Sequence, residues 1–515
     1  MTERGVSGAL VRRLSPLLSA TGPTAEVRSA MTGAVIGELP TSTPDDVTGA
    51  AARARVAQQD WAGRPVTERA QLLLDFHDLV LDHRDELVDL LQTEGGKARL
   101  SATEEVLHVA LTARYYGRNG PRFLRPERGE GVVPFLTRID LNFVPKGIVG
   151  VIAPWNYPMT MAVSEGLAAL AAGNAIVLKP DDQTPLVALA AVELLRRAGL
   201  PADLWAVVHG PGDVVGPQLI DVSSYVCFTG STATGRRVAQ QCAHRLIGCS
   251  LELGGKNPLV VLADADIAKA ADGTVRASFA NAGQLCVSAE RIYVAEPIAA
   301  EFTRALVART QALRLGAALD YDHDMGALIN TSQLERISAH VEDARQKGAT
   351  VLTGGRARPD LGPLFYEPTI LTGVTPQMSC YAEETFGPVV SLYPVADDDE
   401  AVQRANDSEY GLNASVWSAD AGHGRAVAAQ IHCGTVNVNE GFAATFGSID
   451  APMGGMKNSG LGRRQGRDGI RRFVETQSVG TQSGIPIAPS HGLGGRGFTV
   501  VMTGMMRLLR RIGRA

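Results

Sequence analysis

The sequence predicts an α/β protein with two lobes, each built on a parallel β-sheet, and a small extended β element in addition. Short apolar segments alternate with helical segments over residues 146–262 and again over 264–455, which is typical of parallel strands covered by helices on both faces. The chain has 515 residues, of which 45% are hydrophobic and 20% charged. It is therefore too long for a single domain and too apolar for a disordered protein.

Local patterns predict the individual elements. Apolar residues repeat at helical spacing from Leu72 to Leu81, so residues 44–118 are predicted to be helical. Pro121–Pro145 mixes proline, glycine and alternating apolar residues, which favours an extended arm or hairpin. Residues 159–172 and Pro185–Gly199 are expected to form helices. The expected strands are Gly147–Ala153, Ala175–Leu178, Leu204–Val208, Tyr225–Phe228, Pro258–Leu262, Arg291–Val294, Thr350–Leu352, Val389–Val395, Ala414–Ser418 and Thr435–Val438.

The composition excludes several classes of protein. The chain has 49 basic and 54 acidic residues, a balance that argues against a nucleic-acid-binding protein. Its six cysteines form no CxxC motif, so neither a disulfide scaffold nor a zinc ribbon is expected, and no metal site is predicted. No apolar run is long enough to span a bilayer, and the first residues resemble no secretory signal. We therefore expect a cytoplasmic protein with reduced thiols.

The C-terminal tail differs in charge from the rest of the chain. Residues 496–515 contain five arginines and no acid, so the other residues carry a formal charge of −10. On a helical wheel the apolar residues Val501, Met505, Leu508 and Ile512 share one face, and Arg507, Arg510, Arg511 and Arg514 share the opposite one. This pattern is that of a basic helix on an anionic membrane surface, or of one packed on the acidic body of the protein itself.

Two glycine- and proline-rich turns follow predicted strands. In Phe228–Gly235 (FTGSTATG) a strand runs into a helix, so backbone N–H groups can face an anion. The turn fails as a P-loop because Arg236 stands where lysine is required, and GxGxxG is absent. In APWNYP the prolines fix the backbone around Asn156, whose amide could stabilise an oxyanion or be merely solvated.

Two further motifs carry a carboxylate and a thiol. Glu252 precedes a glycine pair in ELGGKNP, and Cys286 ends the polar loop NAGQLC. A thiol nucleophile needs an oxyanion donor, and hydrolysis of its acyl product needs a general base. Cys286, Asn156 and Glu252 would supply these three groups. No histidine lies near these motifs in the sequence, which weakens a Cys/His protease interpretation without excluding it.

Six motifs in order resemble the aldehyde dehydrogenase superfamily: PWNYP, FTGSTATG, ELGGKNP, NAGQLC, EETFGPV and PMGGMKNSGLGR. The resemblance covers residues 25–480 and implies two Rossmann-like lobes. It implies a cofactor-binding domain (20–121 and 145–254), a catalytic domain (255–455) and an oligomerisation arm (122–144 and 468–483), with the tail at 484–515. A homodimer or homotetramer is expected.

The resemblance also implies a role for each site residue. Cys286 would attack the aldehyde to give a thiohemiacetal and then a thioester, Asn156 would hold the oxyanion, and Glu252 would activate the hydrolytic water. Lys179 and Glu384 would bind the two ribose groups of NAD or NADP. The other expected cofactor-binding residues are Asp182, Ser231, Trp155, Gly230 and Phe386. A carboxylate at Asp182 repels a 2′-phosphate, so NAD is expected in preference to NADP.

Three departures from the family pattern bear on charge and substrate. Glu165 and Arg464 stand where many relatives carry lysine and glutamate, and we expect the two to form an ion pair of swapped polarity. The resemblance is strongest to bacterial succinate-semialdehyde dehydrogenases, which implies succinic semialdehyde as substrate. However, Ala280 and Ser164 replace the arginines that usually bind its carboxylate, so Arg464 or Ser448 would have to do so. The alternatives are apolar medium- or long-chain or aromatic aldehydes, or an inactive binding relative.

Overall fold

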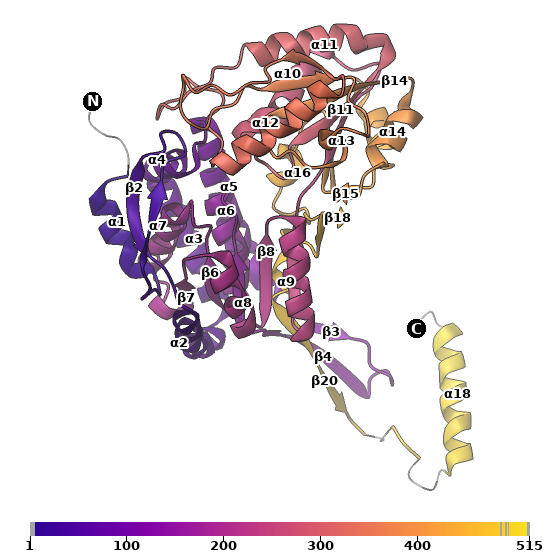
Figure 1. Ribbon diagram of the computed structural model, residues 1–515. Helices are drawn as coiled ribbons and strands as arrows, with labels where there is room; N and C mark the ends of the chain where they lie inside the picture. Colours follow the sequence, from indigo (N-terminus) through magenta and orange to yellow (C-terminus); the bar gives the residue numbers. More distant parts are fainter. Residues whose placement is uncertain (1–5, 485–486, 490–491, 493, 512–515) are drawn as a thin grey trace. The chain divides into compact units, whose positions relative to one another are not determined.

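The computed structural model describes residues 6–484, 487–489, 492 and 494–511, and these form two compact units (Figure 1). The first unit contains the described residues up to Phe123 and the segment Pro145–Phe473. The second contains Leu124–Val144 and the described residues from Val474 onward. Two mainly parallel sheets lie in the first unit, which confirms the predicted α/β fold class.

The N-terminal part of the first unit is mainly helical, as predicted. Helix α2 (Pro44–Gly63) begins with a capping box, in which Thr43 and Asp46 each accept the other's backbone N–H. Helix α5 (Arg99–Phe123) extends further than expected, so the prediction of an extended arm was wrong for Pro121–Phe123. Pro121 lies in the last turn, where its missing N–H removes a single hydrogen bond. The other elements are α1 (Gly8–Leu14), η1 (Ser15–Leu17), β1 (Thr24–Arg28), β2 (Val35–Pro40), α3 (Val66–Asp82) and α4 (Arg84–Gly95).

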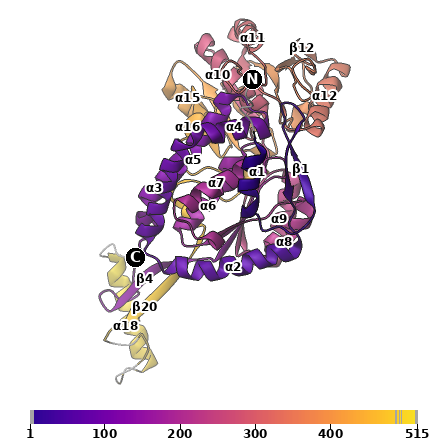
Figure 2. The same cartoon turned by 90° about the vertical axis from the view of Figure 1, so that its left-hand side faces the viewer.

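A six-stranded sheet forms the first lobe, in the order β19-β9-β8-β5-β6-β7. Its strands are β5 (Ile148–Ile152), β6 (Ala175–Lys179), β7 (Trp205–Val207), β8 (Tyr225–Thr229), β9 (Gly248–Glu252) and the antiparallel β19 (Gly460–Leu461). Helices α6 (Pro158–Ala171), α7 (Pro185–Arg197), η2 (Ala202–Leu204), α8 (Gly212–Val222) and α9 (Thr232–His244) connect them. Val47 of α2 and Leu219 of α8 pack in one apolar cluster with Ile148 and Val177 of the sheet. The two helices lie side by side (Figure 2).

A seven-stranded sheet forms the second lobe, in the order β12-β13-β14-β11-β10-β16-β17. All of its neighbouring pairs are parallel except β12 with β13. Its strands are β10 (Asn257–Val261), β11 (Ala289–Ala295), β12 (Thr350–Thr353), β13 (Thr369–Thr372), β14 (Val389–Val395), β16 (Asn413–Trp417) and β17 (Thr435–Val438). Its helices are α10 (Ile267–Phe279), η3 (Ala280–Gly283), α11 (Glu296–Gln311), α12 (Thr331–Gln346), α13 (Ser379–Ala382), α14 (Asp398–Asn406), α15 (Ala421–Ala428) and α16 (Ala443–Phe446).

The chain then returns to the first lobe before it enters the second unit. Strand β15 (Tyr410–Gly411) pairs with β18 (Met456–Lys457), and α17 (Gly466–Arg471) precedes the exit. In the second unit β3 (Glu127–Gly129), β4 (Thr137–Pro145) and β20 (Val474–Gln482) form a three-stranded sheet, so the predicted extended element is present. Helix α18 (Gly495–Arg511) follows. No described helix is long and apolar enough to cross a membrane.

Candidate active site

Cys286 lies in the loop between η3 and β11, which a strained turn holds in place. Asn281, Ala282 and Gly283 all adopt left-handed backbone angles, with φ of 51°, 55° and 70°. A side chain at Gly283 would meet the Gly387 carbonyl oxygen at 2.2 Å, so only glycine fits there. Asn257 donates to the Cys286 carbonyl oxygen at 2.7 Å. The backbone of Cys286 is therefore held in position by the left-handed turn that precedes it and by the hydrogen bond to its own carbonyl oxygen.

The surroundings of Cys286 keep its thiol protonated at neutral pH. Burial raises the pKa of the Cys286 thiol to about 12, and the carboxylates of Glu252 and Glu384 act in the same direction. Arg464 lowers this pKa, but by less. Since the thiolate is the nucleophile, the thiol must give its proton to a base when it attacks a carbonyl carbon.

Asn156 follows β5 and its amide lies beside the cysteine loop. The side chain is buried, and its Nδ2 donates to the Gln284 carbonyl oxygen at 3.2 Å. Asn281 in turn donates to the Asn156 backbone carbonyl at 3.1 Å. A carboxamide nitrogen carries two hydrogens, and this contact uses one of them. The other can donate to an oxyanion formed at the cysteine.

Glu252 is the last residue of β9, and its carboxylate is buried close to the guanidinium groups of Arg464 and Arg463. Burial raises the pKa of Glu252 to about 7, while Arg464 and Arg463 lower it. Its Oε1 has no hydrogen-bond partner among the described residues. A carboxylate with a pKa near neutrality and an unpartnered oxygen is suited to accept a proton from a thiol or a water molecule.

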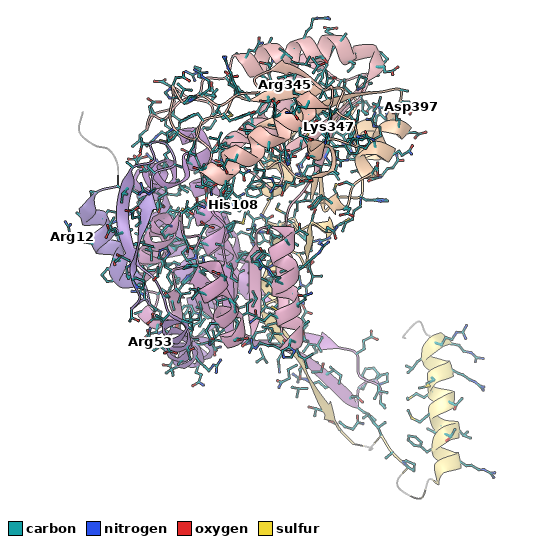
Figure 3. All side chains as sticks on the ribbon, viewed as in Figure 1. Arg12, Arg53, His108, Arg345, Lys347 and Asp397 are labelled. Atoms are coloured by element: carbon teal, nitrogen blue, oxygen red, sulfur yellow. The ribbon has the colours of Figure 1, made fainter. Side chains whose placement is uncertain are left out.

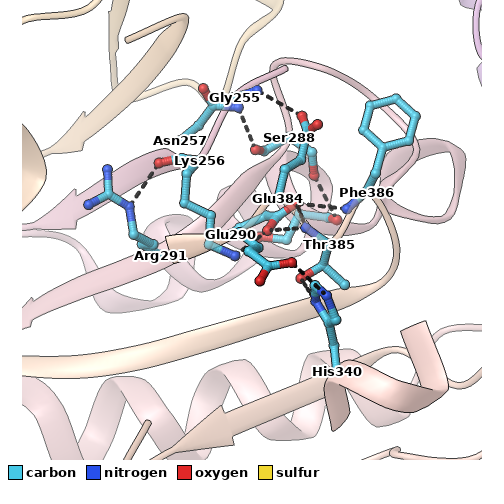
Figure 4. A network of polar contacts seen from close by, with 12 residues as sticks. Gly255, Lys256, Asn257, Ser288, Glu290, Arg291, His340, Glu384, Thr385 and Phe386 are labelled. Carbon is cyan, nitrogen blue, oxygen red and sulfur yellow. Dashed lines mark hydrogen bonds and ion pairs between the residues drawn. The ribbon is translucent and has the colours of Figure 1, made fainter. Parts of the chain in front are cut away.

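A polar network holds the loop that carries Glu384 and Phe386 (Figure 4). The buried Glu290 accepts the backbone N–H of Thr385 at 3.0 Å and that of Phe386 at 2.9 Å, and it pairs with Lys256. Glu384 accepts the N–H of Gly255 at 2.7 Å. Burial raises the pKa of Glu384 to about 8, and the charge of Glu290 adds to this effect. The network thus fixes the Glu384 carboxylate and the Phe386 ring, which meets Trp155 edge-on at 5.4 Å.

The groups that suit a dinucleotide follow the carboxyl ends of neighbouring parallel strands. Gly230 and Ser231 come after β8, and the Ser231 hydroxyl caps α9 by accepting the N–H of Thr234. Lys179 ends β6, and its buried ammonium donates to Asp182 at 3.1 Å. Asp182 also accepts the N–H of Gly210 at 3.2 Å. The N-terminus of α9 thus presents backbone donors suited to a phosphate.

A cavity of about 190 Å³ brings most of the sequence-predicted residues together. Cys286, Glu252, Asn156, Trp155, Gly230, Ser231, Glu384 and Phe386 all line it. Lys179 and Asp182 do not line it; they lie at the end of β6. A side chain at Gly254 would stand 2.5 Å from the Glu384 carboxylate, so the absence of a Cβ keeps this space clear. Aromatic rings, backbone donors and an unpartnered carboxylate oxygen fit a nicotinamide cofactor.

The arrangement can oxidise an aldehyde through a covalent thioester. The thiol of Cys286 would add to the carbonyl carbon and give its proton to Glu252, while Asn156 and the Cys286 backbone N–H would hold the oxyanion. A bound nicotinamide cofactor supplies the acceptor for the hydride. After losing that proton to solvent, Glu252 would take a proton from the water molecule that cleaves the thioester and releases the acid.

Comparisons with known proteins agree with this chemistry. A model described as the aldehyde dehydrogenase family matches residues 18–479. The chain belongs to the aldehyde dehydrogenase family. It is an NAD(P)-dependent enzyme of this family, as the resemblance of its motifs predicted.

Individual relatives of the enzyme are similar over almost their whole lengths. A Mycolicibacterium smegmatis protein, provisionally named succinate-semialdehyde dehydrogenase [NADP(+)], is 52% identical, with 94% of each chain covered. The NAD+ complex of a Bacillus cereus aldehyde dehydrogenase is 34% identical with a TM-score of 0.85, covering 89% of this chain and 93% of that one. An NADP-dependent enzyme of E. coli is also 34% identical, with a TM-score of 0.86 and coverages of 89% and 95%.

The ion pair predicted between Glu165 and Arg464 is present. The Arg464 Nε lies 3.2 Å from a Glu165 carboxylate oxygen, and both side chains are buried. Arg472, which sequence reasoning missed, pairs with the other oxygen of the same carboxylate. Arg464 is therefore engaged in the interior and not placed to hold a substrate tail. Its positive charge instead opposes the rise in the pKa of the nearby Glu252.

Replacing Glu165 by glutamine is expected to lower the stability of the enzyme by about 3 kcal/mol, because it leaves two buried arginines without a carboxylate. The midpoint of urea unfolding measures this loss. The matched control is Glu342→Gln, because Glu342 pairs with Arg345 at 2.8 Å on the surface. That change should cost less than about 1 kcal/mol. Equal losses in the two variants would contradict the argument.

Sequence reasoning also missed residues that hold the site. Lys256 and Glu290 were not named among the predicted site residues. A charged residue directly before or at the start of an apolar strand, as Lys256 and Glu290 are, could have indicated a buried ion pair. Gln333 and Arg336 of α12 line the 190 Å³ cavity. Gln333 donates to the Phe386 carbonyl oxygen at 2.6 Å. No local pattern marks these two, since they come from a surface helix of the other lobe.

Proposed function

We propose that this aldehyde dehydrogenase oxidises succinic semialdehyde to succinate. The names of its 52%-identical relatives support this substrate. The observation that carries the proposal is the position of Arg276, which lines a second cavity of about 160 Å³ together with Tyr157. Tyr157 directly follows Asn156 in the chain and interacts electrostatically with Cys286, so one wall of this second cavity lies close to Cys286. Arg276 is the one arginine or lysine among the described residues that line it.

The electrostatics of Tyr157 link this cavity to the nucleophile. Burial raises the pKa of Tyr157 well above its usual value; Cys286 acts in the same direction and Arg276 in the opposite one. Arg276 pairs with Glu104 at 3.1 Å, and both side chains are partly exposed. A substrate carboxylate could take the place of Glu104 on the guanidinium at little cost, because an exposed ion pair is weak. Arg276 would then bind the substrate carboxylate in place of the two arginines that Ala280 and Ser164 replace.

The remaining lining of the second cavity favours a second candidate, the oxidation of apolar aldehydes. Leu107, Leu111, Phe442 and Phe446 line it. His108, which is labelled in Figure 3, stacks on Phe446 with ring centroids 4.3 Å apart. Burial lowers the pKa of His108 to about 3, so this ring adds no positive charge. Steady-state rates with succinic semialdehyde, butanal, decanal and benzaldehyde discriminate the two functions. The proposal fails if kcat/KM is highest for decanal or benzaldehyde.

The variant Arg276→Gln is expected to lower kcat/KM for succinic semialdehyde by about 10- to 100-fold, since a hydrogen-bonded charge contributes about 1.5–3 kcal/mol. Activity with butanal, which has the same carbon count and no carboxylate, should change little. Lys269→Gln is the control, because Lys269 is an exposed cation on the same helix α10. A parallel loss with both substrates would show that Arg276 has only a structural role.

We also propose that the enzyme accepts NADP at least as well as NAD, which departs from the preference expected from Asp182. Lys179, the N–H of Gly210 and His209, whose Nδ1 lies 3.6 Å away, surround the Asp182 carboxylate. The hydrogen bonds from Lys179 and Gly210 weaken the repulsion of a 2′-phosphate by this carboxylate, and relatives are named as NADP enzymes.

The variant Asp182→Asn is expected to raise the NADP/NAD ratio of kcat/KM about fivefold, because one unit charge at roughly 4 Å in water is worth about 1 kcal/mol. The exposed Asp213→Asn of α8 is the control for a general change in charge. A wild-type enzyme that strongly prefers NAD would refute the proposal for the cofactor.

For assembly, we propose a homodimer or homotetramer in the cytoplasm, formed through the part of the predicted arm that lies in the second unit, residues 124–144 and 474–483. Strand β20 supports this, because every residue after Val474 is exposed along its nine-residue length. An exposed strand of this kind is a template for pairing with another chain. The domain roles follow the predicted division, with cofactor binding at 20–121 and 145–254 and catalysis at 255–455. Light scattering of the purified enzyme measures the number of subunits.

A further inference from the structure

Helix α18 separates apolar from basic residues along its whole length. Phe498, Val501, Met502, Met505, Leu508 and Leu509 recur at spacings of three and four, so they share one face. Arg507, Arg510 and Arg511 lie on the opposite side, and the helix contains no acidic residue. The sequence prediction extended the same pattern to Ile512 and Arg514, which lie outside the described residues.

The apolar face of α18 is only partly covered: Phe498, Met502, Met505 and Leu509 are half-buried. None of its described residues is buried. Val501 and Leu508 of this face are 56% and 58% exposed, although exposing large apolar side chains to water is unfavourable. An apolar stripe with members this exposed can still take a partner, and the charge and length of the helix indicate which one.

Length and charge decide which partner fits this face. At 17 residues and 1.5 Å per residue the helix is about 25 Å long, and it is not apolar enough to span a bilayer. It can lie in the plane of a membrane, with its apolar side chains among the acyl chains. The arginines on the other side can extend toward lipid phosphates, because their long stems allow the charged group to reach the headgroups.

We propose that α18 attaches this aldehyde dehydrogenase reversibly to anionic phospholipid surfaces. The charge of the helix supports an anionic lipid specifically. Its four arginines (Arg496, Arg507, Arg510 and Arg511) are not balanced by any acidic residue within the helix. Attachment would place the enzyme at a lipid surface without altering its chemistry, because α18 and the catalytic residues belong to different compact units.

Co-sedimentation of the full-length enzyme with vesicles tests this proposal. The enzyme should pellet with vesicles of phosphatidylcholine and phosphatidylglycerol, but not with phosphatidylcholine alone, and concentrated salt should release most of it. Two variants separate the apolar face from the charge. Val501→Glu places a carboxylate on the apolar face, and Val500→Glu places the same group on the polar side, where Val500 is 72% exposed.

Both variants change the net charge equally, so only the apolar contact distinguishes them. Val501→Glu should reduce the vesicle-bound fraction at least tenfold more than Val500→Glu, while both retain full dehydrogenase activity in solution. Equal binding by the two variants, binding that does not depend on phosphatidylglycerol, or no binding by the wild type would each overturn the proposal. So would a Val501→Glu enzyme whose subunit number falls while its vesicle binding is unchanged, because α18 would then cover a second copy of the chain.

Discussion

Replacing Cys286 by serine is expected to reduce NAD(P)H formation from any aldehyde by at least about 10⁴-fold, the scale seen when a covalent nucleophile is removed. The hydroxyl of serine is a far weaker nucleophile than a thiolate, and no histidine is among the described residues that line the cavity to activate it. The thiol itself needs assistance, because burial and two carboxylates raise the pKa of Cys286 to about 12. NAD(P)H absorbance at saturating aldehyde measures the loss.

The control for this variant is Cys249→Ser. Cys249 lies in β9 and is as partly exposed as Cys286, but it does not line the catalytic cavity. Its replacement should leave kcat within about twofold of the wild type, because Cys249 does not line the catalytic cavity and the substitution is small. If the Cys286→Ser enzyme retained more than a small fraction of its activity, the covalent mechanism would be wrong.

Replacing Glu252 by glutamine is expected to slow steady turnover by about 10²- to 10⁴-fold while a first equivalent of NAD(P)H can still form. The glutamine amide cannot accept a proton from water, so the thioester on Cys286 accumulates. Rapid mixing would show a burst followed by slow turnover, and added hydroxylamine, which needs no general base, should release the acyl group as a hydroxamate. Release at the wild-type rate without hydroxylamine would exclude Glu252 as the base.

Glu252 is also expected to determine how kcat depends on pH. A general base acts in its deprotonated form, and burial raises the pKa of Glu252 to about 7. When deacylation limits the rate, kcat of the wild type should therefore rise with pH through about 7 and level off above it, whereas the Glu252→Gln enzyme should show no such step. The surface variant Glu342→Gln should keep the wild-type profile.

Several elements follow from local sequence alone. Strand β17 has the bounds that its apolar pattern predicts, and α7 begins at its proline and ends close to its glycine. Local patterns failed at Pro121, because a proline signals a break even where a helix can accommodate it in its last turn. The motifs also predicted Cys286, Glu252 and Asn156 as site residues, and the three line one cavity.

The sequence by itself determined the chemistry. It also predicted one long-range contact, because the charges at Glu165 and Arg464 are both reversed relative to the family pattern, and the two side chains form an ion pair. Only the tertiary structure decided what holds the site. Arg472 joins Glu165 across the unit, Glu290 holds the loop of Phe386, and Arg276, rather than Arg464, lines the second cavity. The physical reason is that a hydrogen bond or ion pair needs a partner within a few ångströms in space, and a sequence records only the distance along the chain.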